Sequence, residues 1–202
     1  DLHSFPTRRS SDLHIDFNET KSFGALNSTE RTAQQTETGR FHTENPNTFW
    51  ARNYRDFAIS KGLTVEQNAR LFAMLFAGTA DAIGACFDSK YVYNFWRPVT
   101  AIQAADTDGN PDTQADAGWV PLANTPPHPE YPAAHGCNAG LVAQVIREFF
   151  GTRDVRMTFT STVPGSVPHV YECTDDLVKE IIAARIYGGR SEEHTSELQS
   201  PI

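Results

Sequence analysis

The sequence predicts an all-α fold, a helical bundle joined by long loops. Apolar residues recur at helical spacing in several segments, residues suited to helix capping lie at the segment ends, and strand-like alternation is confined to one short stretch. The chain has 202 residues, which is enough to bury one substantial core. We therefore expect a single helical domain.

The amino-terminal part is interpreted from its polarity and its first apolar pattern. Residues 14–46 are dominated by Thr, Asn, Gln and Glu, and we expect an irregular lead-in with short helical turns. Over residues 48–61 aromatic side chains recur at helical spacing, and Gly62 suits the left-handed position that ends many helices. This segment is the first predicted helix.

The second predicted helix is the longest. Thr64 and Gln67 have the spacing of a capping box, in which each side chain bonds the backbone N–H of the other residue. A broad apolar face follows. Pro98 forces a break after about Phe95, because proline has no N–H and restricts the residue before it.

The second half of the chain predicts a long loop and two more helices. Residues 104–132 contain many prolines, and a loop of this length in a compact domain is usually functional. One helix is predicted over residues 138–150, with Gly151 just past its end, and another is capped by Thr174. Residues 155–170 alternate in part, and we expect them to be extended or looped.

The composition excludes some classes of function. The net charge of −8 at pH 7 argues against general nucleic-acid binding. No uninterrupted apolar run approaches the ~18 residues that a membrane-spanning helix needs, so we expect no membrane span. The odd number of cysteines does not favour a full disulfide framework, and their spacing is not that of a metal site: Cys86, Cys137 and Cys173.

Neither end of the sequence reads as part of the domain. Residues 1–13 and 190–202 are rich in Ser, Arg, Glu and Thr and lack apolar periodicity. Both resemble conceptual translations of the adapters that are ligated to DNA in short-read sequencing. The alternative is a pair of ordinary disordered tails. We expect residues 14–189 to form the domain and to be an internal piece of a longer protein.

Three basic residues placed around one histidine form the candidate site: Lys90, Arg97, Arg185 and His135. Fixed cations beside a histidine suit a tetrahedral oxyanion such as phosphate or vanadate. Lys90 and Arg97 are two helical turns apart, so both can point the same way near the end of one helix. Taken singly, these two could instead complement the helix dipole, and Arg185 could be a snorkelling side chain.

His135 lies three residues before the helix predicted from residue 138. Free N–H groups at a helix N-terminus attract anions, and Ala134 is small enough to let the backbone approach a ligand closely. The alternative is a capping or buried structural histidine. The other histidines of the domain lack this context, and we expect surface or loop roles for them: His14, His42, His128 and His169.

These segments resemble the vanadium-dependent haloperoxidase and type 2 phosphatidic acid phosphatase superfamily, and they are most similar to bacterial proteins of the vanadium haloperoxidase type. The family pattern is Lys-x6-Arg-Pro, then Pro-Ser-Gly-His, then Ser-Arg-x5-His. The first motif is complete here, within DSKYVYNFWRPVTAIQAADTDGNP. The resemblance covers most of residues 40–189 and implies the helical bundle of this family, truncated at its C-terminus.

The other two motifs depart from the family pattern. The second keeps His135 but has Ala133 and Ala134 where the family has serine and glycine. The third keeps Arg185 but has Ser191 where the family has its last histidine, so the axial ligand to a metal is absent. Loss of one hydrogen-bond donor of this type can cost ~3 kcal/mol of transition-state stabilisation. We therefore expect weak vanadate binding and little turnover from this chain.

The resemblance implies a role for each matched residue. Lys90, Arg97 and Arg185, with the backbone N–H of Ala134, would hold the oxygens of vanadate or of a phosphoryl group. His135 would act as the general acid–base. The missing histidine would bind vanadium or, in phosphatases, attack phosphorus.

The implied activity is that of a vanadate-dependent haloperoxidase with hydrogen peroxide, a halide and an organic acceptor as substrates. One alternative is an acid phosphatase that hydrolyses phosphomonoesters, with phosphate in the same site. A second alternative is a non-catalytic, anion-binding helical domain. The acidic composition and the family favour export from the cytoplasm, and the sequence is compatible with an oligomer.

Overall fold

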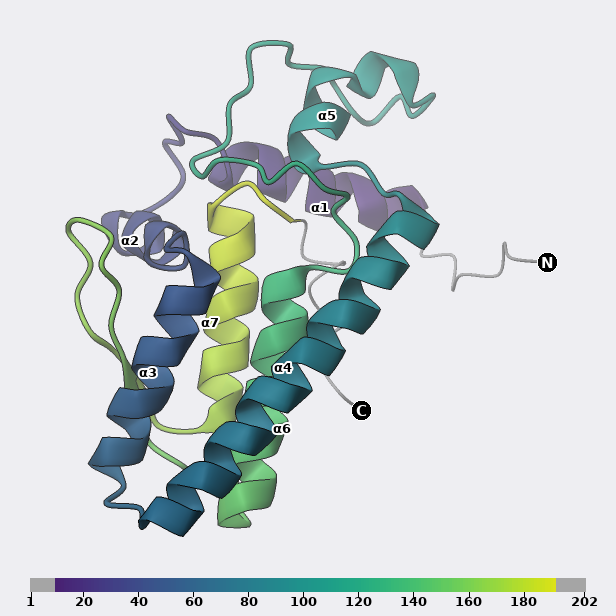
Figure 1. Ribbon diagram of the computed structural model, residues 1–202. Helices are drawn as coiled ribbons and strands as arrows, with labels where there is room; N and C mark the ends of the chain where they lie inside the picture. Colours follow the sequence, from purple (N-terminus) through teal and green to yellow (C-terminus); the bar gives the residue numbers. More distant parts are fainter. Residues whose placement is uncertain (1–9, 192–202) are drawn as a thin grey trace.

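The computed structural model describes residues 10–191, with side chains from residue 15 onward (Figure 1). The prediction of an all-α helical bundle is confirmed. The elements are α1 (Ser10–Phe23), α2 (Ala33–Phe41), α3 (Pro46–Ser60), α4 (Val65–Tyr93), α5 (Pro98–Gln103), a 3-10 turn (Ala105–Thr107), α6 (Ala134–Phe150), β1 (Met157–Phe159), β2 (His169–Tyr171) and α7 (Thr174–Tyr187).

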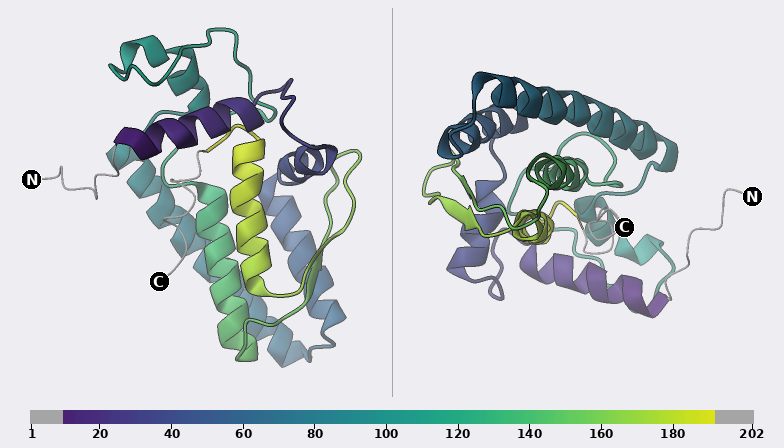
Figure 2. Two further views of the ribbon diagram at one scale, coloured as in Figure 1. Left: turned by 180° about the vertical axis from the view of Figure 1, so that it is seen from behind. Right: turned by 90° about the horizontal axis from the view of Figure 1, so that it is seen from below.

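Helices α6 and α7 lie side by side at the centre of the bundle (Figures 1 and 2). Helix α4 packs along α6, and α2 packs against α7. Helix α1 lies across one end and contacts α5 and α7 (Figure 2). The core is apolar and rich in aromatic rings, and its fully buried members include Tyr54, Leu71, Leu75, Ile146, Phe159, Tyr171, Leu177 and Ile181.

Several predicted helix ends are confirmed. Thr64 and Gln67 form the capping box at the start of α4, with both reciprocal hydrogen bonds present. Gly62 and Gly151 have positive φ, at 60° and 72°, just after α3 and α6. At such positions glycine avoids the steric cost that a Cβ would incur. Local chemistry therefore sets these boundaries.

The expectation of an irregular lead-in over residues 14–46 is wrong, because α1 and α2 occupy much of it. Their apolar residues are too sparse to show a strong helical period. Helix α2 depends instead on a capping box between Thr32 and Gln35 and on packing against α7. Residues 10–13, expected outside the domain, form the start of α1, whereas residues 1–9 and 192–202 lie outside the described residues.

Residues 155–170, expected to be extended or looped, contain most of a two-stranded antiparallel hairpin. Met157 pairs with Tyr171 and Phe159 pairs with His169. Phe159 and Tyr171 point into the core, whereas Val170 is exposed. The hairpin therefore closes the core beside α3 and carries His169 to the side of α7.

Helix α4 lies at the edge of the bundle (Figure 2). By length and composition, the helical stretch Val65–Gln103 is apolar enough to cross a membrane, with a mean hydropathy of 1.4 over its best window. Only 17% of that window is buried within the described structure. Apolar side chains such as Phe76, Tyr91 and Val92 remain exposed. The expectation of no membrane span stays a prediction, and this long apolar helix is an observation against it.

The loop between α5 and α6 is tied to the residues that directly follow α1 and α7. The backbone N–H of Leu122 donates to the carbonyl of Gly24 at 2.9 Å, and the N–H of Ala123 donates to the carbonyl of Gly188 at 3.0 Å. Gly189 has a φ of 64°, and a Cβ there would lie 2.7 Å from the Gly24 carbonyl oxygen. This close approach fixes the turn that follows α7.

Candidate active site

The first candidate residue, Lys90, lies in the last turn of α4 and is completely buried. Its Nζ donates to the backbone carbonyls of Pro129 and Glu130, at 2.8 and 2.6 Å. Burial, together with the nearby charge of Arg97, lowers the pKa of Lys90 to about 8. Helix α4 thus delivers a desolvated cation to the loop before α6.

Arg97 is the N-cap residue of α5 and is 7% exposed. Its Nε donates to the carbonyl of His128 at 2.8 Å, and its Nη1 donates to the carbonyl of Arg190 at 3.0 Å. Its Nη2 lies 2.9 Å from His128 Nδ1. The pKa of Arg97 is lowered by burial. The planar guanidinium therefore bridges the loop before α6 and the turn after α7.

The prediction that Lys90 and Arg97 share one helix is wrong. Helix α4 ends at Tyr93, and Asn94 adopts a left-handed conformation with φ of 47°. The helix ends two residues earlier than expected, and Arg97 lies beyond it in an extended conformation. The two cations lie near each other because both donate to the carbonyls of residues 128–130.

His135 lies in the first turn of α6, which begins at Ala134 and not at the predicted residue 138. The residues of this first turn are polar or small, so they show no apolar helical period in the sequence. Ala133, the N-cap residue, makes no side-chain hydrogen bond, so no capping residue marks the start of the helix. Desolvation lowers the pKa of His135 well below its usual value, and the charges of Arg185 and Arg190 add to this, whereas contact with the His42 backbone opposes it. His135 is therefore neutral at neutral pH.

Arg185 lies in the last turn of α7 and is 4% exposed. Its Nη2 donates to the Arg190 carbonyl at 3.3 Å, and its Nε donates to Ser191 Oγ at 3.1 Å. Burial lowers the pKa of Arg185 to about 9, with the charges of Arg190 and Arg97 as further causes. Arg97 and Arg185 thus share one acceptor, the Arg190 carbonyl oxygen.

A cavity of about 380 Å³ lies beside these groups. Arg185, His135 and Ala134 line it, whereas Lys90 and Arg97 are not among its lining residues. The N-terminus of α6 opens onto it, and the first N–H groups of a helix have no intrahelical acceptor. Other lining residues come from α3, α4, α6 and the segments before α3 and α6, among them Glu44, Asn47, Trp50, Thr79, Phe87, His128 and Asn138.

The local charge is positive. Within residues 10–191, no carboxylate forms an ion pair with Lys90, Arg97 or Arg185, whose side-chain hydrogen bonds go to backbone carbonyls, to His128 and to a serine hydroxyl. Glu130 lies near them and raises their pKa values, but its own carboxylate is buried and has no hydrogen-bond partner. Such uncompensated, desolvated cations favour an anion.

Two residues of this region were not predicted as site residues. Arg190 was assigned to a segment outside the domain, yet it lines the cavity and its carbonyl accepts from both guanidinium groups. His128 was assigned a surface or loop role, yet it is half-buried and bonded to Arg97. The proline-rich context of His128 could have indicated an ordered position near the site. The role of the Arg190 carbonyl could not be read from the sequence, because every residue has a backbone carbonyl.

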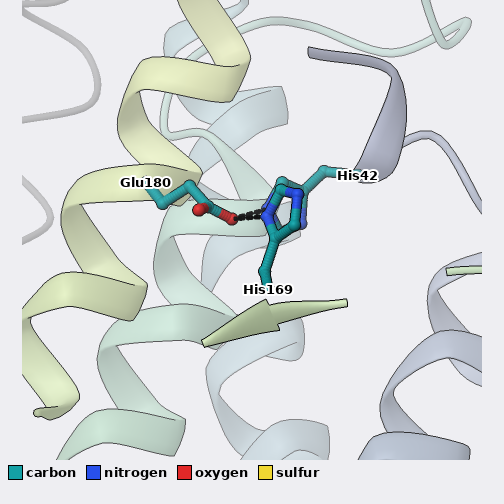
Figure 3. Close-up of side chains that lie close together, drawn as sticks. All are labelled: His42, His169 and Glu180. Atoms are coloured by element: carbon teal, nitrogen blue, oxygen red, sulfur yellow. Dashed lines mark hydrogen bonds and ion pairs between the residues drawn. The ribbon is translucent and has the colours of Figure 1, made fainter. Parts of the chain in front are cut away.

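The other two described histidines lie in a cluster with Glu180 (Figure 3), so the surface role expected for His42 and His169 is wrong. Burial lowers the pKa of His42. Desolvation opposes protonation of His169, but hydrogen bonds to Glu180 and Glu37 outweigh it and raise the pKa. Burial alone would raise the pKa of Glu180, yet its hydrogen bonds from the histidines and Tyr171 lower it to about 2. The side chain of His14 lies outside the described residues.

Comparison with known proteins gives one family. A family model for the VCPO second helical-bundle domain matches residues 70–196, which contain every predicted site residue. A curated relative, the vanadium chloroperoxidase of Curvularia inaequalis, is 29% identical over 155 residues. That match covers 64% of this chain and 25% of the relative.

Solved structures extend the likeness in fold. A crystal structure described as the first bacterial vanadium-dependent iodoperoxidase superposes with a TM-score of 0.79 and 22% identity, over 97% of this chain and 48% of that chain. An apo-type bacterial vanadium-dependent chloroperoxidase gives a TM-score of 0.70 and 17% identity, over 98% of this chain and 48% of that chain. This chain therefore spans about half the length of these structures.

Proposed function

The chain belongs to the family of the VCPO second helical-bundle domain, and on that premise we propose that it is the anion-binding part of a vanadium-dependent haloperoxidase. The whole enzyme would use hydrogen peroxide to oxidise a halide to a hypohalous species, with water as the other product, and the hypohalous species would then halogenate an organic acceptor. The observation that carries this proposal is the set of buried cations, Lys90, Arg97 and Arg185, next to a cavity lined by His135.

The donor set fits vanadate. Arg185 lines the cavity and offers a planar fork for oxygen atoms, and Arg97 and Lys90 add positive charge close to it. The present acceptors of these donors are neutral: the Arg190 carbonyl and the Ser191 hydroxyl. An oxyanion can take the place of these acceptors and form a stronger hydrogen bond, because both partners are then charged. The N-terminus of α6 adds backbone N–H groups at Ala134 and His135. Bound vanadate would supply the centre that activates peroxide.

His135 would move the proton. Its lowered pKa keeps the imidazole neutral, so it can accept a proton from peroxide bound in the cavity and return it later in the cycle. The adjacent charges of Arg185 and Arg190 oppose a lasting imidazolium, which favours rapid release of the proton. The cavity's apolar wall, with Trp50, Ile83 and Phe87, would limit water around the reacting atoms.

The chain as given would bind vanadate weakly. Ala133 caps α6 without a side-chain hydrogen bond, and Ser191 provides a hydroxyl where the family pattern has an imidazole. These same two observations favour the non-catalytic alternative, in which the domain binds a phosphate-like anion and performs no reaction. Both proposals require the same cations, and they differ in whether peroxide is consumed.

The test measures anion binding and turnover together. Orthovanadate and phosphate are titrated calorimetrically into the chain, into Arg185→Gln and into the matched control Arg153→Gln, whose side chain is exposed. We expect weak binding that Arg185→Gln abolishes and Arg153→Gln preserves, with the two anions in competition. Absence of binding by the folded chain would overturn the proposal.

Activity assays separate the candidates. The first assay supplies vanadate, hydrogen peroxide and bromide and follows the bromination of an organic dye. Bromination by the wild-type chain that is lost in Arg185→Gln would support the haloperoxidase. Hydrolysis of p-nitrophenyl phosphate without vanadate would contradict it and assign the site to a phosphatase. Anion binding with neither activity, even after the histidine is introduced at position 191, would favour the non-catalytic domain.

A further inference from the structure

A second cluster of ligating side chains lies beside α7, and the backbone of its His42 contacts His135, which lines the anion cavity. His42 follows α2, His169 lies on β2, and Glu180 lies on α7 (Figure 3). Each offers one ligand atom, and these atoms all lie within 4.8 Å of one another. We propose that His42, His169 and Glu180 bind a divalent transition-metal ion of the zinc class.

The donor set matches that class of metal. Two imidazole nitrogens and one carboxylate oxygen are ligands that zinc and cobalt(II) accept, and three protein ligands leave one position open for water or an anion. His42 is far from His169 and Glu180 in the sequence, so the fold itself brings it to them. A metal there would tie α2, the hairpin and α7 to one another.

The hydrogen bonds in the cluster converge on a single atom. Glu180 Oε1 lies 2.9 Å from His42 Nε2, 2.7 Å from His169 Nδ1 and 2.6 Å from the Tyr171 hydroxyl. One carboxylate oxygen offers about two lone pairs, so three donors exceed its ordinary capacity. A cation between the two imidazoles and the carboxylate would turn both nitrogens into ligands and leave the Tyr171 hydroxyl as the oxygen's donor.

The surroundings of His169 resemble those of a metal ligand. Its second nitrogen, Nε2, lies 2.8 Å from Glu37 Oε2. Metal-binding histidines almost always donate their other N–H to a carboxylate or carbonyl, which fixes the ring and its tautomer. The Phe41 ring also stacks on His169, with centroids 3.8 Å apart and planes at 9°. The ring is therefore preoriented from two sides.

The cluster is enclosed but accessible. The side chain of His42 is 4% exposed and that of His169 is 10% exposed, so competition from bulk water is limited. A cavity of about 440 Å³, lined by Glu37, His169 and Glu180, gives an entry path. A site with its ligands gathered and a path to solvent needs little rearrangement to load an ion.

The experiment uses the chain without an added histidine tag. Cobalt(II) is titrated and followed by its visible absorption, and zinc is then added to displace it. We expect one ion per chain with the intense absorption of a low-coordinate N/O site, full displacement by zinc, and a zinc-dependent rise in melting temperature.

Three variants test the assignment of ligands. Glu180→Gln and His169→Gln should lower the affinity at least about 100-fold, and Glu37→Gln should lower it about 10- to 100-fold because it removes only the outer partner of His169. The control Glu172→Gln alters an exposed carboxylate on the same hairpin and should change nothing. Circular dichroism establishes that each variant is folded.

Two results would overturn the proposal. One is the absence of saturable cobalt or zinc binding by the folded wild-type chain, which would leave a hydrogen-bonded network and no metal site. The other is binding that survives in both Glu180→Gln and His169→Gln, which would place the ion elsewhere. Vanadate binding is measured in parallel, because none of the three proposed metal ligands lines the anion cavity.

Discussion

Arg185 and Ser191 contact each other twice in the turn after α7. The Ser191 hydroxyl accepts from Arg185 Nε at 3.1 Å, and the Ser191 backbone N–H donates to the Arg185 carbonyl at 3.4 Å. Ser191 is fully buried. The position at which the family pattern has a histidine is thus built into the site and held against one of its cations.

The first prediction concerns that position. Ser191→His should increase the affinity for orthovanadate about tenfold or more, because an imidazole nitrogen can coordinate vanadium and a serine hydroxyl does so poorly. Ser191→Gln is the control, because glutamine is similar in size to histidine but has no imidazole, and it should not increase the affinity for orthovanadate. Vanadium-51 NMR and calorimetry measure the affinity, and an equal gain in both variants would contradict the prediction.

The second prediction concerns the glycine that shapes this turn. Gly189→Ala should lower the free energy of unfolding clearly more than Gly62→Ala does, although both glycines have similar positive φ values. A Cβ at position 62 would have nothing within 4 Å, whereas at 189 it would lie 2.8 Å from the Trp119 ring. We expect about 1 kcal/mol for Gly62→Ala and at least twice that for Gly189→Ala. Urea unfolding provides the measurement, and equal losses would refute it.

The third prediction concerns acid stability. Both oxygens of Glu44 accept from Arg52 at 2.7 Å, and this pair, with a further bond from the Thr162 N–H, lowers the pKa of Glu44 to about 2. Because the folded pKa lies below the unfolded value, the ionised carboxylate stabilises the fold above about pH 4.5, and this stabilisation is lost as the pH falls toward 2.

Glu44→Gln should therefore cost about 2 kcal/mol at pH 7 and progressively less below pH 4.5. Unfolding by urea between pH 2.5 and 7 measures the difference from wild type. The exposed pair of Glu172 with Arg156 is the control, and Glu172→Gln should change stability by less than about 0.5 kcal/mol. If the loss of unfolding free energy in Glu44→Gln were the same at every pH, the result would be inconsistent with this account.

The fourth prediction concerns Glu130. Its side chain is 1% exposed and neither carboxylate oxygen has a hydrogen-bond partner. Glu130→Gln should change the free energy of unfolding by less than about 1 kcal/mol, because relief from burying a carboxylate without a hydrogen-bond partner is offset by loss of its attraction to the neighbouring cations. It should also tighten phosphate binding, because a negative charge near Arg97 and Arg185 disappears. Thermal unfolding and calorimetry measure both effects, and unchanged or weaker phosphate binding would contradict the prediction.

Local signals account for what the sequence predicted of the fold. The capping box at Thr64 and the glycines after α3 and α6 act within a few residues, so their effect is legible without tertiary structure. Helices α1 and α2 escaped prediction because they depend on packing across one end of the bundle and against α7. The end of α4 at Tyr93 was missed because Asn94, and not Pro98, turns the chain.

The site is predictable to a smaller extent. Lys90, Arg97, His135 and Arg185 were named from their motifs, and their proposed roles stay predictions. The Arg190 carbonyl was not foreseeable, because a main-chain oxygen belongs to every residue and only the turn at Gly189 aims it. The cluster of His42, His169 and Glu180 was also missed, since its members are joined by the hairpin and not by any spacing in the chain.

The shared acceptor of Arg97 and Arg185 has a kinetic consequence. The Arg190 carbonyl solvates both guanidinium groups from within the chain, so the cations are already screened before any ligand arrives. Uptake of an oxyanion is then an exchange of one partner for another. Its speed would depend on how readily the Arg190 carbonyl gives up its hydrogen bonds to the two guanidinium groups.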